Sequence, residues 1–144
     1  MNRCSWPGTS SKEEKPWGHE ISWTGLFHGK EIFIKSGFRT SLKFNVQKNE
    51  LLYVQSGRVI AEYADEGHFK DSNKCPASAR ELLPGDILNV QAGCPYRLSA
   101  LDNSIVFEIS DRGAFRRVII EDDYGRESED SSQEKLIFKP LIGQ

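Results

Sequence analysis

The chain contains 144 residues, of which 19 are basic and 21 acidic, so its formal charge is −2 with histidine neutral. This length fits one domain. The hydrophobic fraction of 38% is sufficient for a core, but no run approaches the roughly 20 apolar residues of a membrane span. A balanced charge without a basic block argues against a nucleic-acid surface. We therefore expect a globular domain that binds neither membranes nor nucleic acids.

The cysteines and the first residues of the chain predict its compartment. Cys4, Cys75 and Cys94 are scattered, and no pair has the short spacing of a zinc knuckle or a redox motif. The segment up to about Lys15 is polar and contains no apolar stretch that could act as a secretory signal. These features predict a protein of a reducing compartment, and we expect it to be cytoplasmic.

Residues 1–14 are small and polar, which is typical of a flexible N-terminal arm. After this arm the chain consists of short runs rich in β-branched and aromatic residues, each bounded by Gly, Asn, Asp or Pro. Nine runs predict strands, at 19–24, 31–36, 40–46, 51–55, 58–64, 80–83, 86–91, 95–100 and 104–109. No segment has a convincing amphipathic helical pattern. Many short, closely spaced strands predict an all-β sandwich or barrel.

Residue alternation is clearest in the run 40–46. Leu42 and Phe44 lie on one face of the expected strand, whereas Lys43 and Asn45 lie on the other. One face of this strand is therefore polar and carries reactive groups. At 55–58 the sequence QSGR predicts a tight hairpin, and LPGD at 83–86 predicts a turn.

Two polar segments interrupt the strand pattern. Residues 64–74 are too polar for a core strand and too many for a hairpin turn, so they predict an exposed loop. Residues 127–144 begin as a polar linker and end in the apolar run 136–142. We expect this apolar tail to dock either on its own sheet or on a second copy of the chain, and we therefore expect a homodimer.

Two motif frames and three short sequences carry a resemblance to a known family. The first frame has Gly37, Lys43, Asn45, Glu50 and Gly57 at intervals of five, one, four and six residues. In the second frame, intervals of five, one and two residues separate the following positions: Gly85, Gln91, Gly93 and Tyr96. Both frames resemble those of the cupin superfamily. KPWGHE at 15–20, TSLKFN at 40–45 and EDDYGR at 121–126 resemble, more narrowly, the type II mannose-6-phosphate isomerase group.

The resemblance covers about residues 15–126 and implies a single cupin domain, which is a double-stranded β-helix or jelly roll with a small-molecule site at one open end. It also implies four inward positions that hold a metal in many cupins. Here these positions are Lys43, Asn45, Glu50 and Tyr96. Only the Glu50 carboxylate is a good metal ligand, because lysine and tyrosine are protonated at neutral pH and asparagine offers a neutral carbonyl. We expect no metal and no other cofactor.

Lys43 has two possible roles in such a site. It could form a buried, chemically inert ion pair with Glu50. Alternatively, its charge could bind an anionic or hydroxylated ligand, with hydrogen bonds from Asn45, Tyr96 and Gln47, which we place in the adjoining inward position. Arg126 could reach the mouth of the pocket from the EDDYGR segment or could form a local surface salt bridge.

Three functions follow as hypotheses. The first is a metal-free cupin that binds a sugar or sugar phosphate. The second is a sugar-phosphate isomerase or epimerase in which Glu50 or Lys43 moves a carbon-bound proton and Tyr96 acts as the acid. The third is a module without catalysis whose role is to dimerise. We expect Trp17 and Gly18 to form a structural bracket at one end of the barrel.

Overall fold

The fold of this chain is all-β in a computed structural model that describes residues 3–4, 8–64, 78–111 and 116–126. Within these residues there are eleven strands and no helix. The strands are β1 (Thr9–Lys15), β2 (Gly18–Thr24), β3 (His28–Ile34), β4 (Leu42–Asn45), β5 (Glu50–Ser56), β6 (Val59–Tyr63), β7 (Ser78–Leu82), β8 (Ile87–Val90), β9 (Tyr96–Ala100), β10 (Ser104–Ser110) and β11 (Arg117–Glu121). No helix that could cross a membrane occurs in this described part of the chain.

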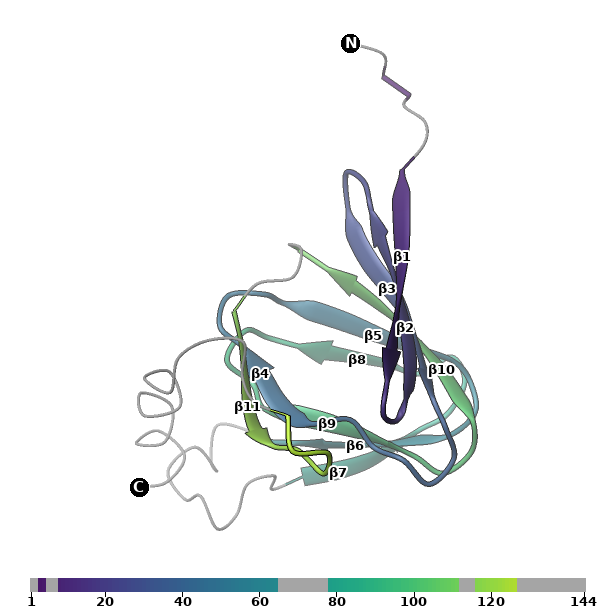
Figure 1. Ribbon diagram of the computed structural model, residues 1–144, viewed down its shortest axis with the longest axis vertical. Helices are drawn as coiled ribbons and strands as arrows, with labels where there is room; N and C mark the ends of the chain where they lie inside the picture. The colour runs from purple at the N-terminus through teal and green to yellow at the C-terminus, as the bar shows by residue number, and fades with distance from the viewer. Residues whose placement is uncertain (1–2, 5–7, 65–77, 112–115, 127–144) are drawn as a thin grey trace.

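Two antiparallel sheets form the jelly roll that the sequence predicted (Figure 1). The six-stranded sheet has the order β1-β2-β3-β10-β5-β8, and the five-stranded sheet has the order β11-β4-β9-β6-β7. Strands β1, β2 and β3 extend beyond the other strands of the barrel (Figure 1). This extension gives the barrel one tall wall, and the candidate site lies against the inner face of that wall.

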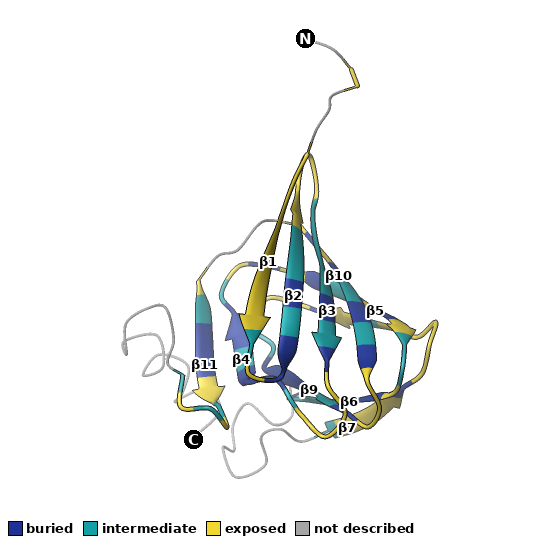
Figure 2. Ribbon diagram, turned by 45° about the vertical axis from the view of Figure 1, so that its right-hand side comes forward, coloured by how far each residue is buried: buried dark blue, intermediate teal, exposed yellow. Residues whose placement is uncertain are grey.

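Buried apolar residues from both sheets form the core, and Figure 2 marks the buried stretches of the strands in dark blue. On β10, for example, Val106 is 1% exposed whereas Ile109 on the opposite face is 55% exposed. This contrast follows from the period-2 alternation of side chains along a strand. Trp17 lies in the core, as expected of a bracket residue. A Cβ atom on Gly18 would lie 1.9 Å from the Phe33 carbonyl oxygen, so only glycine fits there.

Two strands were missed in the sequence. We predicted a flexible arm over residues 1–14, but residues 9–14 belong to strand β1. This strand pairs with β2 from Thr9↔Thr24 to Lys15↔Gly18. Its sequence, TSSKEEK, has no apolar residue because β1 is an exposed edge strand, and charged side chains suit such an edge. The second missed strand is β11, which pairs with β4.

The predicted hairpin at 55–58 is also wrong. Strand β5, which precedes it, belongs to the six-stranded sheet, and β6, which follows it, belongs to the five-stranded sheet. The turn therefore crosses between sheets, and Gly57 allows this with φ of +87° and a close approach to Ser104. The turn at 83–86 is confirmed, since the Asp86 amide donates to the Leu83 carbonyl at 2.9 Å. Residues 65–74 and 127–144, including the apolar tail, lie outside the described residues.

Candidate functional site

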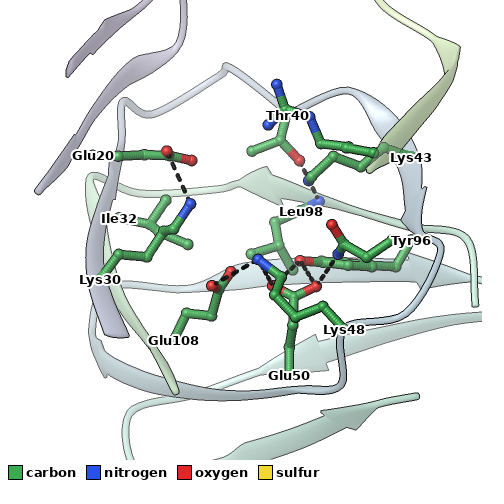
Figure 3. A pocket seen from close by; sticks show the side chains of 12 residues that line it. Glu20, Lys30, Ile32, Thr40, Lys43, Lys48, Glu50, Tyr96, Leu98 and Glu108 are labelled. Carbon is green, nitrogen blue, oxygen red and sulfur yellow. Dashed lines mark hydrogen bonds and ion pairs between the residues drawn. The ribbon is translucent and has the colours of Figure 1, made fainter. Parts of the chain in front are cut away.

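A small cavity of about 30 Å³ lies between the two sheets, at the base of the tall wall (Figure 3). Charged and polar side chains dominate its lining, which comes from seven strands and from the loops beside β4. The lining residues are Glu20, Lys30, Ile32, Thr40, Lys43, Asn45, Lys48, Glu50, Tyr96, Leu98, Glu108 and Arg117. A volume of this size holds about one or two water molecules, so it cannot hold a sugar.

Lys43 and Asn45 reach this cavity because β4 turns its polar face inward. The alternation of the run 40–46 predicted such a face, and the structure confirms it for these two residues. The opposite face of β4 is also buried, with Leu42 at 2% and Phe44 at 6% exposure. Strand β4 is thus covered on both sides, and its charged side is the one toward the barrel interior.

Lys48 supplies the cation of a buried ion cluster. Its Nζ atom lies 3.4 Å from Glu108 Oε2 and 3.7 Å from Glu50 Oε2, and no side chain of the three is more than 7% exposed. A second ion pair stands nearby on the tall wall, where Lys30 Nζ lies 3.2 Å from Glu20 Oε2. Buried charges are tolerated when they are paired and hydrogen-bonded in this way.

Glu50 is the most densely bonded group of the cavity. It accepts hydrogen bonds from Asn45 Nδ2 and from the Tyr96 hydroxyl, the latter at 3.2 Å and 3.3 Å to its two oxygens. Burial, and then its hydrogen bond with Glu108, raises the pKa of Glu50 to about 8, whereas the pKa of Glu108 is lowered. The two carboxyl groups therefore share one proton at neutral pH, with Glu50 as its holder.

Lys43 lacks the ion pair with Glu50 that the sequence suggested. Among the described residues no carboxylate oxygen lies within 4.0 Å of its Nζ atom, and Lys48 takes the place beside Glu50 instead. The Lys43 Nζ atom stands over the Tyr96 ring, 4.7 Å from its centroid, because the two residues are register partners on β4 and β9. Burial lowers the pKa of Lys43 to about 8 despite the attraction of Glu50. Burial also raises the pKa of Tyr96, so its hydroxyl stays protonated.

Two residues expected in the site lie elsewhere. Gln47 is exposed and does not line the cavity, because the turn after β4 places Lys48 inward in its stead. Arg126 is held by the Asp122 carboxylate through two side-chain hydrogen bonds of 3.1 Å and 2.8 Å, and it does not line the cavity either. In the EDDYGR segment the Tyr124 hydroxyl donates to the Arg39 carbonyl. These contacts give the segment a structural role.

A larger groove of about 410 Å³ adjoins the cavity and opens to solvent. Lys30, Lys48 and Glu108 line both spaces, so the groove and the small cavity adjoin at these three residues. Hydroxyl-bearing side chains of the tall wall and of β10 face the groove, together with His28. The groove is lined by Ser11, Ser22, Trp23, Thr24, His28, Gly29, Lys30, Lys48, Glu108 and Ser110. Its volume lies in the range of small-molecule sites, roughly 300–1,000 Å³.

The donor set does not fit a divalent metal. Glu50 is surrounded by the Lys48 ammonium, the Tyr96 hydroxyl and the amide nitrogen of Asn45, all of which are hydrogen-bond donors. A metal needs acceptor atoms and would be repelled by the ammonium groups of Lys43 and Lys48. Within the described residues, no three His, Cys, Asp or Glu side chains are grouped so as to hold an ion.

Five charged residues of the cavity were not predicted from the sequence: Glu20, Lys30, Lys48, Glu108 and Arg117. A signal for two of them was present. In strand β10 (SIVFEIS), Glu108 lies on the same face as the buried Val106. In strand β3 (HGKEIFI), Lys30 lies on the same face as the buried Ile32 and Ile34. A charge on the apolar face of a strand indicates either a buried ion pair or a site.

No family model and no curated protein matches this sequence. Among solved structures the chain is similar to oxalate decarboxylase of Lactobacillus farciminis in a formate complex, with a TM-score of 0.65, 16% identity, and coverage of 83% of this chain and 38% of that one. It is similar to KdgF of a Halomonas species, with a TM-score of 0.56, 16% identity, and coverage of 71% and 84%. It is also similar to the capsular polysaccharide assembling protein CapF of Staphylococcus aureus, with a TM-score of 0.58, 13% identity, and coverage of 86% and 34%.

The chain thus spans little more than a third of the oxalate decarboxylase and CapF chains, and KdgF is matched over most of its length. Sequence identities of this size reveal the fold and not the activity. The two antiparallel sheets, the strand order and these structural matches agree. The chain has the cupin fold.

Proposed function

We propose that this protein is a metal-free cupin, related to the mannose-6-phosphate isomerase kind, that binds a sugar or sugar phosphate. The observation that supports this function most is the groove of about 410 Å³ above the ion cluster. The cavity between Lys43, Glu50 and Tyr96 has about 30 Å³ and is too small for a sugar ring. The ligand therefore occupies the groove and turns one polar end toward the cluster.

The groove lining matches the chemistry of such a ligand. Ser11, Ser22, Thr24 and Ser110 present hydroxyl groups, each of which both donates and accepts hydrogen bonds, as sugar hydroxyls do. The ammonium groups of Lys30 and Lys48 border the groove and can donate hydrogen bonds to a phosphate or hydroxyl oxygen, while Glu20 and Glu108 balance their charge. The side chains stand on paired strands, which hold them in fixed positions.

The test is a thermal-shift screen with hexoses and hexose phosphates. A ligand at 100 times its Kd stabilises the folded state by about 2.7 kcal/mol, so a bound sugar phosphate is expected to raise Tm by several degrees. In Ser11→Tyr this shift is expected to disappear, because the ring projects from exposed β1 into the groove.

Ser10→Tyr is the matched control. Ser10 neighbours Ser11 on the same exposed strand but faces the other side of the sheet, so this variant is expected to keep the shift. An equal loss in both variants, or the absence of a shift with every sugar and sugar phosphate, would contradict binding in the groove and favour a dimerising module.

An isomerase or epimerase is the second candidate. Glu50 and Lys43, each with a pKa of about 8, exchange protons readily near neutral pH, as general acid–base catalysis requires. Tyr96 keeps its proton, because its pKa is raised, and its hydroxyl donates a hydrogen bond to Glu50. Incorporation of solvent deuterium at a carbon of the bound sugar phosphate distinguishes this enzyme from a binding protein. Homodimer formation and a cytoplasmic location remain predictions of the sequence.

A further inference from the structure

Lys43 differs from the other two lysines of the cavity. Lys30 and Lys48 are ion-paired at 3.2 Å and 3.4 Å. Lys43 forms no ion pair with any residue that the structure describes, and its Nζ atom lies over the Tyr96 ring. An ammonium that contributes to an ion pair holds its proton and is no nucleophile. Lys43 is therefore the lysine whose amine lone pair is most readily available inside the barrel.

The charges around Lys43 come from four strands. Glu50 of β5, Glu20 of β2 and Glu108 of β10 favour its protonated form, while Arg117 of β11 opposes it. Burial outweighs the three carboxylates and lowers the pKa of Lys43 to about 8. At pH 7 about one Lys43 in ten is then a free amine, compared with roughly one in 2,500 for an ordinary lysine of pKa 10.4.

A carboxylic acid lines the same cavity as this amine. Glu50 holds the proton that it shares with Glu108, and the Tyr96 hydroxyl bonds to both Glu50 oxygens. A nucleophilic amine, a protonated carboxyl group and a phenol thus border one space that has room for a carbonyl group and little more.

We propose that Lys43 forms a reversible imine with the carbonyl carbon of a small aldehyde or ketone, whose remaining atoms extend toward the groove. The Lys43 nitrogen adds to the carbonyl carbon to give a carbinolamine. Glu50 then protonates the carbinolamine hydroxyl, which leaves as water while the C=N bond forms, and the resulting Glu50 carboxylate takes up the proton that the nitrogen loses. No oxidant or reductant takes part. The inference rests on the proposed function only in that the groove seats the rest of the carbonyl compound.

Reductive trapping tests this reaction. The protein is incubated at pH 7 with glyoxylate and cyanoborohydride, which reduces an imine to a stable carboxymethyl amine, and the labelled residues are located by peptide mass mapping. Lys43 is expected to be labelled at least about tenfold faster than an ordinary lysine, because far more of it is unprotonated. The α-amino group has an ordinary pKa near 8 and serves as a positive reference for exposed amines.

Lys35 is the internal control. It also lies over an aromatic ring, with Nζ 5.7 Å from the Phe38 centroid, but it is exposed. Between pH 6 and 10 the labelling rate of Lys43 is expected to level off above pH 8, whereas the rate of Lys35 keeps rising. Lys43→Arg keeps the charge and is expected to abolish the label at position 43, with a circular dichroism spectrum like that of the wild type.

Labelling of Lys43 no faster than that of Lys35, or a Lys43 rate that rises without a plateau, would overturn the inference. If a sugar phosphate still raises Tm in that case, the proposed function stands, because the thermal-shift screen measures binding in the groove independently of the reaction at Lys43. If Lys43 is labelled but no sugar phosphate raises Tm, the imine at Lys43 is supported and the proposed sugar binding is contradicted.

Discussion

Replacing Lys48 by methionine is expected to destabilise the fold by about 3–5 kcal/mol, because it leaves a buried carboxylate without its cation. Lys48 is the only residue that the described structure places within 4.0 Å of both Glu50 and Glu108 as a cation. Methionine keeps most of the volume of the side chain, so the loss measures charge and not packing. Urea unfolding at pH 7 gives the difference in free energy.

Lys12→Met is the matched control for this experiment. Lys12 pairs with Glu14 at 3.3 Å on the surface of β1, where both side chains are more than half exposed. Such pairs contribute about 0–1 kcal/mol. A loss below about 1 kcal/mol in Lys48→Met, similar to that in Lys12→Met, would contradict the ion cluster at the centre of the barrel.

The stability of the protein is expected to fall as the pH rises from about 4.5 to about 8. In this window folded Glu50 keeps its proton, since its pKa is raised from 4.5 to about 8, while unfolded Glu50 has lost it. The folded state then binds more protons than the unfolded state, so raising the pH favours unfolding, by on the order of 4 kcal/mol across the window.

Below pH 4.5 the trend is expected to reverse. The pKa of folded Glu108 is lowered, so the unfolded state takes up protons there that the folded state does not, and acid destabilises the protein. The titration of Glu50 and Glu108 alone therefore gives a maximum in the free energy of unfolding near pH 4.5. In Glu50→Gln the fall between pH 5 and pH 8 is expected to flatten, because a neutral amide replaces the titrating group.

Free energies of unfolding in urea between pH 4 and pH 9 check this for the wild type and the variant. Glu62→Gln on β6 is a suitable control, because this carboxylate lies outside the cavity lining and its loss is expected to leave the slope unchanged. A slope in Glu50→Gln equal to that of the wild type would show that the proton is held elsewhere.

The fold was accessible from the sequence because period-2 alternation and turn residues are local signals. The run 40–46 revealed a polar inward face, and LPGD at 83–86 gave a turn. Strand pairing is not local, and for this reason the turn at 55–58 was mistaken for a hairpin although it joins different sheets. β1 has no apolar residue to signal it, so only its pairing with β2 identifies it as a strand.

The site was predictable in part. Motif spacing brought Lys43, Asn45, Glu50 and Tyr96 together, and the structure places all four around one cavity. Spacing alone did not reveal which lysine pairs with Glu50, because Lys48 reaches it from a turn whose geometry the sequence does not specify. Glu20, Lys30 and Glu108 come from strands outside both motif frames, and it is the pairing of β3 with β10 that brings Lys30 opposite Glu108.

We expect that Lys43 and a carboxyl group that shares a proton, and not a metal ion, occupy the positions that hold a metal in many proteins of the cupin fold. Elemental analysis tests it most directly, on protein expressed in medium supplemented with Mn, Fe, Ni and Zn and purified without chelator. We predict that no metal approaches one ion per chain and that EDTA leaves Tm unchanged. A near-stoichiometric metal whose removal by EDTA lowers Tm would contradict a metal-free site.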